Sequence, residues 1–198
     1  MKIEKAFVEL RIGGQKKIPS GSSSGFSFIE ILIVVAMAGV IAAAAYPVIT
    51  STMNHYESES AFELVLSTMR TARQSAIDKR RAYRLTFTAP GSIAVWRQDS
   101  GFAWERDRQL NMTENVSFSL PSGIPRIPMI PHSSDIDFGG DDTFMFRADG
   151  SAVSTTGRVI SGVVYLSRNN DANSCWAVSV FGGTGLARAW TYEEGQWN

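Results

Sequence analysis

The sequence has few of the residues that build disulfides, metal centres and catalytic groups. Its 198 residues include one cysteine and two histidines. Cys175 alone cannot form an internal disulfide or a cysteine-rich metal site. Neither His55 nor His132 belongs to a Ser/His/Asp order, an H-E-x-x-H motif or a phosphate-binding loop. We therefore predict no catalytic site and no cofactor, and we expect Cys175 to be a small buried residue of a strand.

An excess of charge of one sign is also missing. Lysine and arginine total 19, as do aspartate and glutamate, so the formal net charge is zero. This balance argues against a protein that holds nucleic acid mainly by bulk charge. The neutrality is nevertheless a sum of unequal parts. Residues 1–25 carry five basic and two acidic side chains, a net charge of +3, which leaves −3 for the rest.

One long apolar run follows the basic segment. Residues 26–49 contain a single charged side chain, Glu30. A bilayer core needs about 20 apolar residues as a helix, so this run is long enough to span one. Basic residues before the run and acidic excess after it predict a single-pass protein with its N-terminus in the cytoplasm.

Two other interpretations of the run stay open. It could be the buried core helix of a soluble protein, although its basic flank and its length argue against this. It could also be a secretory signal peptide, with an A-x-A cleavage site at residues 43–45 and Tyr46 as the mature start. The flexible linker at 19–25 and the charge of Glu30 within the run argue against that alternative, because a bilayer makes such a charge costly.

The junction between linker and apolar run carries the most specific motif. Gly25, Phe26 and Glu30, followed by Ile-Leu-Ile-Val-Val, resemble the class III signal of type IV pilins and type II secretion pseudopilins. The resemblance implies that a prepilin peptidase removes residues 1–25 by cutting between Gly25 and Phe26, and that Phe26 is then N-methylated. It also implies an inner-membrane location with a periplasmic head. The implied partners are other pilins or pseudopilins and an inner-membrane assembly platform.

Three residues of the run are candidates for assembly. A lone carboxylate in hydrocarbon needs a cationic partner, and the new amine of Phe26 lies about one helical turn from Glu30 in the same or a neighbouring subunit. Gly39 opens a small-x-x-x-small face that lets helices approach closely in lipid. Pro47 is placed to bend the helix. The plainer alternatives are a Glu30 that snorkels to solvent and an alanine-rich helix without a packing face.

The remainder predicts an α+β head. Residues 50–81 form an amphipathic helix with one apolar stripe, made of Phe62, Val65, Leu66, Met69, Ala72 and Ala76. Residues 82–198 alternate in short runs typical of an antiparallel sheet. Strands are expected at 84–88, 92–96, 116–120, 143–147, 159–167, 175–181 and 186–192. A proline-rich loop at 121–131 interrupts them. We expect the long helix to pack on one sheet, as in the pilin fold that the resemblance implies.

Weaker motifs at 75–84, 144–150 and 176–188 resemble the pseudopilin H/FimT branch. This implies a minor pseudopilin of the type II secretion system. The alternative is a FimT-like minor type IV pilin that acts in pilus assembly or DNA uptake. DNA-binding members carry Gly-Arg-x-Arg, whereas this chain has Gly185-Leu-Ala-Arg188. Arg158 and Arg188 are possible DNA contacts, but the acidic mature chain argues against nucleic acid as a partner.

An acidic loop at 135–142 is the one candidate for a metal. Its four aspartates, at 135, 137, 141 and 142, could hold calcium through oxygen ligands. They lack the spacing of an EF-hand, and we expect a solvated loop without a metal.

Overall fold

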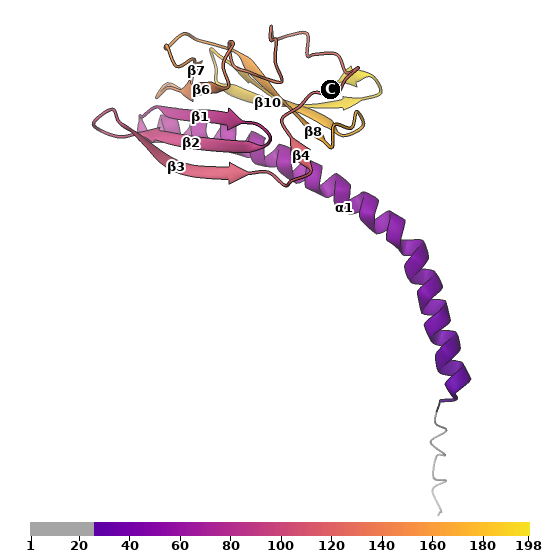
Figure 1. The fold of residues 1–198 in the computed structure, drawn as a ribbon. Coiled ribbons are helices and arrows are strands. Elements are labelled where there is room, and N and C mark those ends of the chain that lie inside the picture. Colours follow the sequence, from indigo (N-terminus) through magenta and orange to yellow (C-terminus); the bar gives the residue numbers. More distant parts are fainter. Residues whose placement is uncertain (1–25) are drawn as a thin grey trace, which may run out of the picture. The chain divides into compact units, whose positions relative to one another are not determined.

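The computed structural model describes residues 26–198, except for the side chains of 47–55. The chain forms two compact units, Met1–Ala45 and Tyr46–Asn198, which are taken one at a time below. Helix α1 (Phe28–Lys79) supplies the described part of the first unit and the start of the second, and the strands follow it (Figure 1). The stretch Phe28–Tyr46 is long and apolar enough, by length and composition, to cross a membrane.

Local hydrogen bonds and charges explain where α1 begins and ends. At the start, the carbonyl of Ser27 accepts hydrogen bonds from the amides of Glu30 (3.0 Å) and Ile31 (3.2 Å). Glu30 in the first turn and Lys79 in the last complement the helix dipole. At the end, Arg80 adopts a left-handed conformation with φ of 51°. The amide of Arg80 then donates to Ile77 and that of Arg81 to Ala76, which is a Schellman cap. This cap ends the helix at Lys79, before the expected residue 81.

The strands form two antiparallel sheets rather than the single sheet expected. The first sheet has the order β3-β2-β1-β6-β7 and the second β11-β10-β9-β8-β4, with β5 paired to β8. The strands are, in chain order, β1 (Tyr83–Thr88), β2 (Ser92–Gln98), β3 (Trp104–Asn111), β4 (Val116–Ser117), β5 (Ile136–Asp137), β6 (Thr143–Phe146), β7 (Ala152–Val153), β8 (Gly162–Arg168), β9 (Cys175–Phe181), β10 (Leu186–Glu193) and β11 (Gln196–Trp197). The α+β class is as expected from the sequence.

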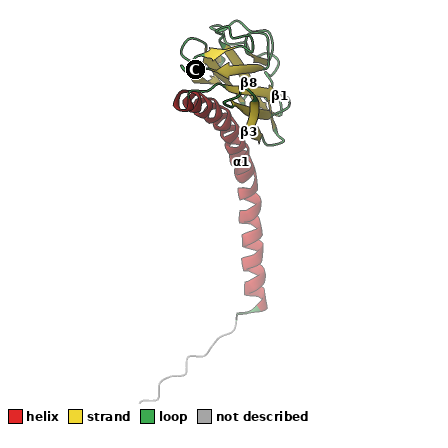
Figure 2. Cartoon of the chain, turned by 90° about the vertical axis from the view of Figure 1, so that its left-hand side faces the viewer, coloured by secondary structure: helices red, strands yellow, loops and turns green. Residues whose placement is uncertain are grey.

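The main core lies between the second half of α1 and both sheets. The whole predicted stripe of the helix is buried, and Val65, Met69, Ala72 and Ala76 are fully so. Against it pack residues of β1, β2 and β6 from the first sheet and of β8, β9 and β10 from the second. Figure 2 shows the strands of the head gathered along this part of the helix. Both sheets therefore pack on the same apolar stripe of the helix.

A second, smaller core covers the other face of β8 and β9. Val163, Tyr165, Ala177 and Trp190 pack there with Ile127 of the proline-rich loop. Because alternate residues of a strand point to opposite faces, β8 is buried on both sides, from Gly162 to Ser167. This is why its sequence is a continuous apolar run instead of an alternation.

Several strand boundaries differ from those expected. β3 was not expected, because its sequence WERDRQLN has no apolar alternation; it forms as an edge strand that pairs only with β2. The run 116–120 contributes a strand only over Val116–Ser117. β8 begins at Gly162, because Val159 makes only an isolated bridge to Val153. In each case the extent of the strand depends on hydrogen bonding to a neighbouring strand and not on the local alternation of apolar residues.

Candidate functional site

The first described feature with functional meaning is the apolar start of α1. Its large side chains are exposed in the chain itself: Phe28 is 78% exposed and Val40 71%. None of the window Phe28–Tyr46 is buried. A continuous apolar surface of this size is not stable against water, so it needs a bilayer or other helices around it.

The predicted processing and pairing residues lie at the beginning of this helix. Gly25 lies outside the described residues, so the proposed cleavage position is described on one side only. Phe26 precedes the helix and is 78% exposed. Glu30 lies in the first turn, exposed. Among residues 26–46 and 56–198, no ion pair involves Glu30. Phe26 and Glu30 thus share one helix end, and their pairing stays a prediction.

Gly39 makes no close contact with the rest of the described chain. Apart from its own stretch of helix backbone, no described residue lies within 4 Å of the position that a Cβ atom would occupy there. A glycine in a helix interior costs about 1 kcal/mol relative to alanine. A small residue without a contact of its own is suited to the close approach of another helix. Pro47 falls in α1, in the stretch 47–55 whose side chains lie outside the description.

The two arginines proposed as DNA contacts have different neighbours. Arg158 is exposed in the turn before β8, and its amide donates to the Ser154 hydroxyl (3.2 Å). The Arg188 guanidinium stacks on Trp190, 4.0 Å from the ring centre. Arg188 lines a groove of about 650 Å³ between α1 and β10 together with Arg70 and Arg73. Sequence reasoning missed these two helix arginines, because their proximity to Arg188 arises only from packing.

The glycine of the Gly185-Leu-Ala-Arg188 motif is explained by the turn between β9 and β10. Gly185 has φ of +61°, and a Cβ atom there would lie 1.8 Å from the Gly150 carbonyl oxygen. The Arg73 guanidinium braces the same place, since its Nε donates to the carbonyls of Gly150 (3.2 Å) and Thr184 (3.0 Å). The motif therefore has a structural reason that needs no ligand.

The acidic loop uses its central carboxylate internally. Asp137 accepts hydrogen bonds from the amide (2.7 Å) and hydroxyl (3.2 Å) of Ser133 and from the amide of Gly140 (2.7 Å). Burial alone would raise the pKa of Asp137, but these bonds outweigh it and hold the pKa below its ordinary value. Asp135 pairs with Arg126 at 3.5 Å. In the described part of the chain, no group of three His, Cys, Asp or Glu is placed to hold a metal ion.

Cys175, Tyr165 and His132 lie within or against the head. Cys175 is buried, as expected, and burial raises the pKa of its thiol to about 12. Tyr165 pins the proline-rich loop: its hydroxyl lies 2.6 Å from Nε2 of His132 and accepts the amide of Ile127 at 2.8 Å. Burial raises the pKa of Tyr165 to about 12 as well. His55 lies in the stretch 47–55, whose side chains are not described.

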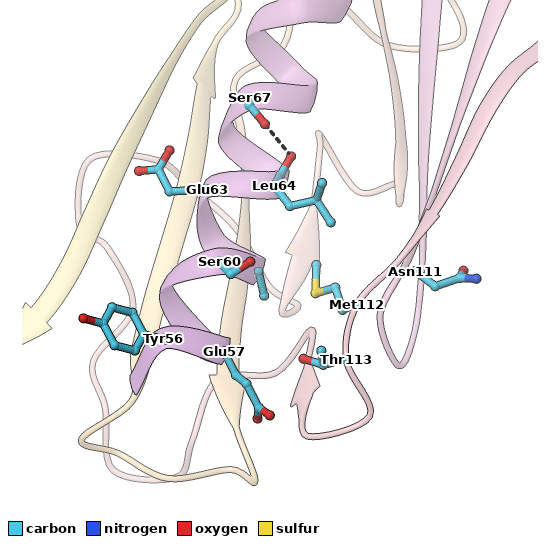
Figure 3. A pocket seen from close by; sticks show the side chains of 10 residues that line it. Tyr56, Glu57, Ser60, Glu63, Leu64, Ser67, Asn111, Met112 and Thr113 are labelled. Carbon is cyan, nitrogen blue, oxygen red and sulfur yellow. Dashed lines mark hydrogen bonds between the residues drawn. The ribbon is translucent and has the colours of Figure 1, made fainter. Parts of the chain in front are cut away.

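A larger groove, of about 760 Å³, runs along the head part of α1 (Figure 3). Its apolar floor comes from Ala61, Leu64 and Met112, and Glu57 and Glu63 border it. Met112 comes from the segment after β3, which the sequence did not indicate as a strand. The groove could therefore not be found from the sequence.

No protein-family model matches the chain, and no curated protein matches it. Solved structures to which it is similar include the minor pseudopilin EpsH from the type II secretion system of Vibrio cholerae. That match is 9% identical, covers 67% of this chain and 95% of that one, and has a TM-score of 0.47. The type IV minor pilin FimU of Pseudomonas aeruginosa is 13% identical, with coverages of 72% and 93% and a TM-score of 0.49.

Proposed function

We propose that this chain is a minor pilin-like subunit, held in the bacterial inner membrane by residues 26–49 and assembled into a periplasmic filament. The machine we favour is the type II secretion system, in which the chain acts as a minor pseudopilin that helps protein export. No catalytic role is proposed. Its partners would be a prepilin peptidase, other pseudopilins or pilins, and the inner-membrane assembly platform.

A single observation carries this proposal: an exposed apolar stretch of helix, Phe28–Tyr46, that bears one carboxylate, Glu30, in its first turn. A simple anchor has no use for that charge. A subunit that transfers from lipid into a helix bundle does, because the Phe26 amine of a neighbour can neutralise it and fix the axial position. The apolar side chains leave lipid and pack against neighbouring helices. This transfer changes their hydrophobic free energy little, because both surroundings are apolar.

N-terminal sequencing and intact-mass analysis test the first step. The chain is co-expressed with a prepilin peptidase and recovered from membranes. We expect a mature start at Phe26 with one added methyl group. The Gly25→Ala variant should accumulate uncleaved. A mature start at Tyr46 would instead establish the secretory signal peptide and contradict the proposal.

The Glu30→Ala variant tests the second step. It should be cleaved like the wild type, because the cut lies on the far side of Phe26. Its incorporation into filaments should fall about tenfold or more, since an unpaired neighbouring amine is left in the bilayer. Filament recovery by shearing, compared with total membrane protein, measures this. Wild-type incorporation of Glu30→Ala would show that the carboxylate does not direct assembly.

The second candidate is a FimT-like minor type IV pilin in pilus assembly or DNA uptake. One observation favours it: the groove shared by Arg70, Arg73 and Arg188. Retardation of duplex DNA by the full chain in neutral detergent, at low and at moderate salt, distinguishes the two. Salt-sensitive binding that Arg188→Ala abolishes, and that Arg158→Ala leaves intact, would favour the DNA-uptake role.

A further inference from the structure

Arginine and tryptophan side chains alternate across the outer face of the first sheet. Arg84 of β1 pairs in register with Trp96 of β2, and Trp96 pairs with Arg106 of β3. Trp104 of β3 lies beside them. These four residues are called the Arg–Trp ladder. Their face is opposite to the core, because the neighbouring Leu85 points inward and is fully buried.

Cation–π contacts hold the ladder together. The Arg84 guanidinium lies 5.1 Å from the ring centre of Trp96 and 4.7 Å from that of Trp104. The Arg106 guanidinium lies 4.8 Å from Trp96. Trp96 is thus contacted from both neighbouring strands. Stacking on an indole restricts the motion of a guanidinium, so less conformational freedom is lost when the group binds a ligand.

The two arginines keep an uncompensated charge. Elsewhere in this sheet, Arg97 pairs with Glu105 and Arg108 with Asp107. Within the part of the chain that the structure describes, neither Arg84 nor Arg106 has a carboxylate partner. Arg106 donates only to the amide oxygen of Gln109, at 2.9 Å.

The other outward positions on the neighbouring strands carry no charge. The Nε atom of Arg84 is buried and has no hydrogen-bond partner among the described residues. The other outward positions of β1, β2 and β6 are Thr86, Thr88, Ser92, Ala94, Gln98, Thr143 and Met145. A chain whose described part carries more acidic than basic residues therefore presents one face with two unpaired cations and two indoles.

We propose that the Arg–Trp ladder is a docking surface for an acidic segment of a partner protein, with carboxylates that reach Arg84 and Arg106. Arginine and tryptophan are the side chains that dominate protein interfaces, and a guanidinium binds a carboxylate through two parallel hydrogen bonds. The two arginines are two strands apart, so the carboxylates must lie about 10 Å from each other.

Two other occupants fit less well. A nucleic-acid base or a sugar needs a free aromatic face, and guanidinium groups lie over the rings of both Trp96 and Trp104. A phosphate chain needs many cations for useful affinity at physiological salt, and the ladder offers two. This inference concerns the head alone and does not depend on whether the apolar helix assembles.

Fluorescence anisotropy with a defined peptide tests the proposal. The full chain in neutral detergent is titrated into a labelled Gly/Ser peptide with glutamates every third residue. The wild type should bind it, and Arg84→Gln and Arg106→Gln should each weaken binding about tenfold. Arg158→Gln, the matched loss of an exposed charge elsewhere, should leave affinity unchanged. Arg84→Lys should also weaken binding, because lysine lacks the planar fork.

Five results would overturn the proposal. They are undetectable binding by the wild type at millimolar peptide, equal affinity for a peptide with glutamine in place of glutamate, tighter binding of oligothymidylate than of the peptide, full affinity in Arg84→Lys, and full affinity in Arg106→Gln. Circular dichroism confirms that each variant is folded. Should Arg84→Gln unfold, Arg106→Gln alone decides the outcome, since its side chain is exposed at the sheet edge.

Discussion

The two parts of α1 are built for different surroundings. Over Phe28–Tyr46 the apolar side chains are exposed on all sides of the helix, and no described residue covers them. From Phe62 to Ala76 apolar residues recur on one side only, and that side is buried under both sheets. One helix thus carries two kinds of hydrophobic surface, which differ both in composition and in the pattern of their apolar residues. The first surface is suited to any apolar surroundings, such as lipid, whereas the second fits one specific set of side chains in the two sheets.

The strongest way to break this comparison is to truncate one large residue in each part. Met69→Ala leaves a cavity between the helix and the sheets and should lower the free energy of unfolding by about 2–5 kcal/mol. The matched change Val35→Ala in the exposed part should shift it by less than about 0.5 kcal/mol. Urea unfolding of the full chain in neutral detergent, followed by tryptophan fluorescence, measures both. Equal losses would mean that the exposed part also packs on the head.

Enlarging the glycine of the exposed part tests the opposite property. Gly39→Leu should leave the stability of the head unchanged, because no other side chain of the described residues lies within 4 Å of the position of its Cβ atom. It should weaken association between helices about tenfold by holding backbones apart. Energy transfer between labelled chains in lipid vesicles measures this, with Val40→Leu as the control. Undiminished association of Gly39→Leu would remove Gly39 from the assembly face.

One carboxylate of the head, Asp137, contributes to stability in a way that depends on pH. Asp137 of the head has three donors in place, and its pKa is lowered. It therefore stabilises the fold above pH ~4, and this contribution is lost as pH falls through the lowered pKa. Asp137→Asn should cost about 1–2 kcal/mol at neutral pH and flatten the acid side of the stability profile. Asp142→Asn, an exposed neighbour, should change neither.

The smallest effect is expected where the packed part of the helix ends. Arg80 holds a left-handed conformation that favours glycine. Arg80→Gly should raise the free energy of unfolding by about 0.5–1 kcal/mol. The same change at Arg81, whose backbone has no positive φ, should give no gain. Thermal unfolding of the two variants side by side checks this, and a loss in Arg80→Gly would mean that its side chain outweighs the strain.

The sequence predicted those parts whose pattern is local. The apolar run, the stripe from Phe62 to Ala76 and the hairpin of β1 and β2 follow from periodicity and turn residues, and the structure has all three. β3 was missed because an edge strand with polar residues on both faces has no alternation to read. The cap at Arg80 was missed because no glycine marks it.

The division into two sheets was missed for a different reason. Both faces of β8 are covered, one by α1 and one by the proline-rich loop, and its sequence does not say which strands lie beside it. The candidate residues show the same limit. Glu30 stands out in an apolar run, but the grouping of Arg188 with Arg70, or of Arg84 with Trp96, depends on contacts between segments far apart in the chain.

The double covering of β8 has a consequence for how the head opens. Hydrogen exchange of its amides requires that β4 or β5 and β9 separate from it, and that either the helix or the loop pinned by Tyr165 moves away. A local fluctuation cannot separate β8 from all of these neighbours, so its amides should exchange only through global unfolding. The amides at the exposed edge of β3 should exchange by local fraying. Mechanical or thermal stress would therefore loosen the head from its β3 edge inward, with β8 as the last strand to yield.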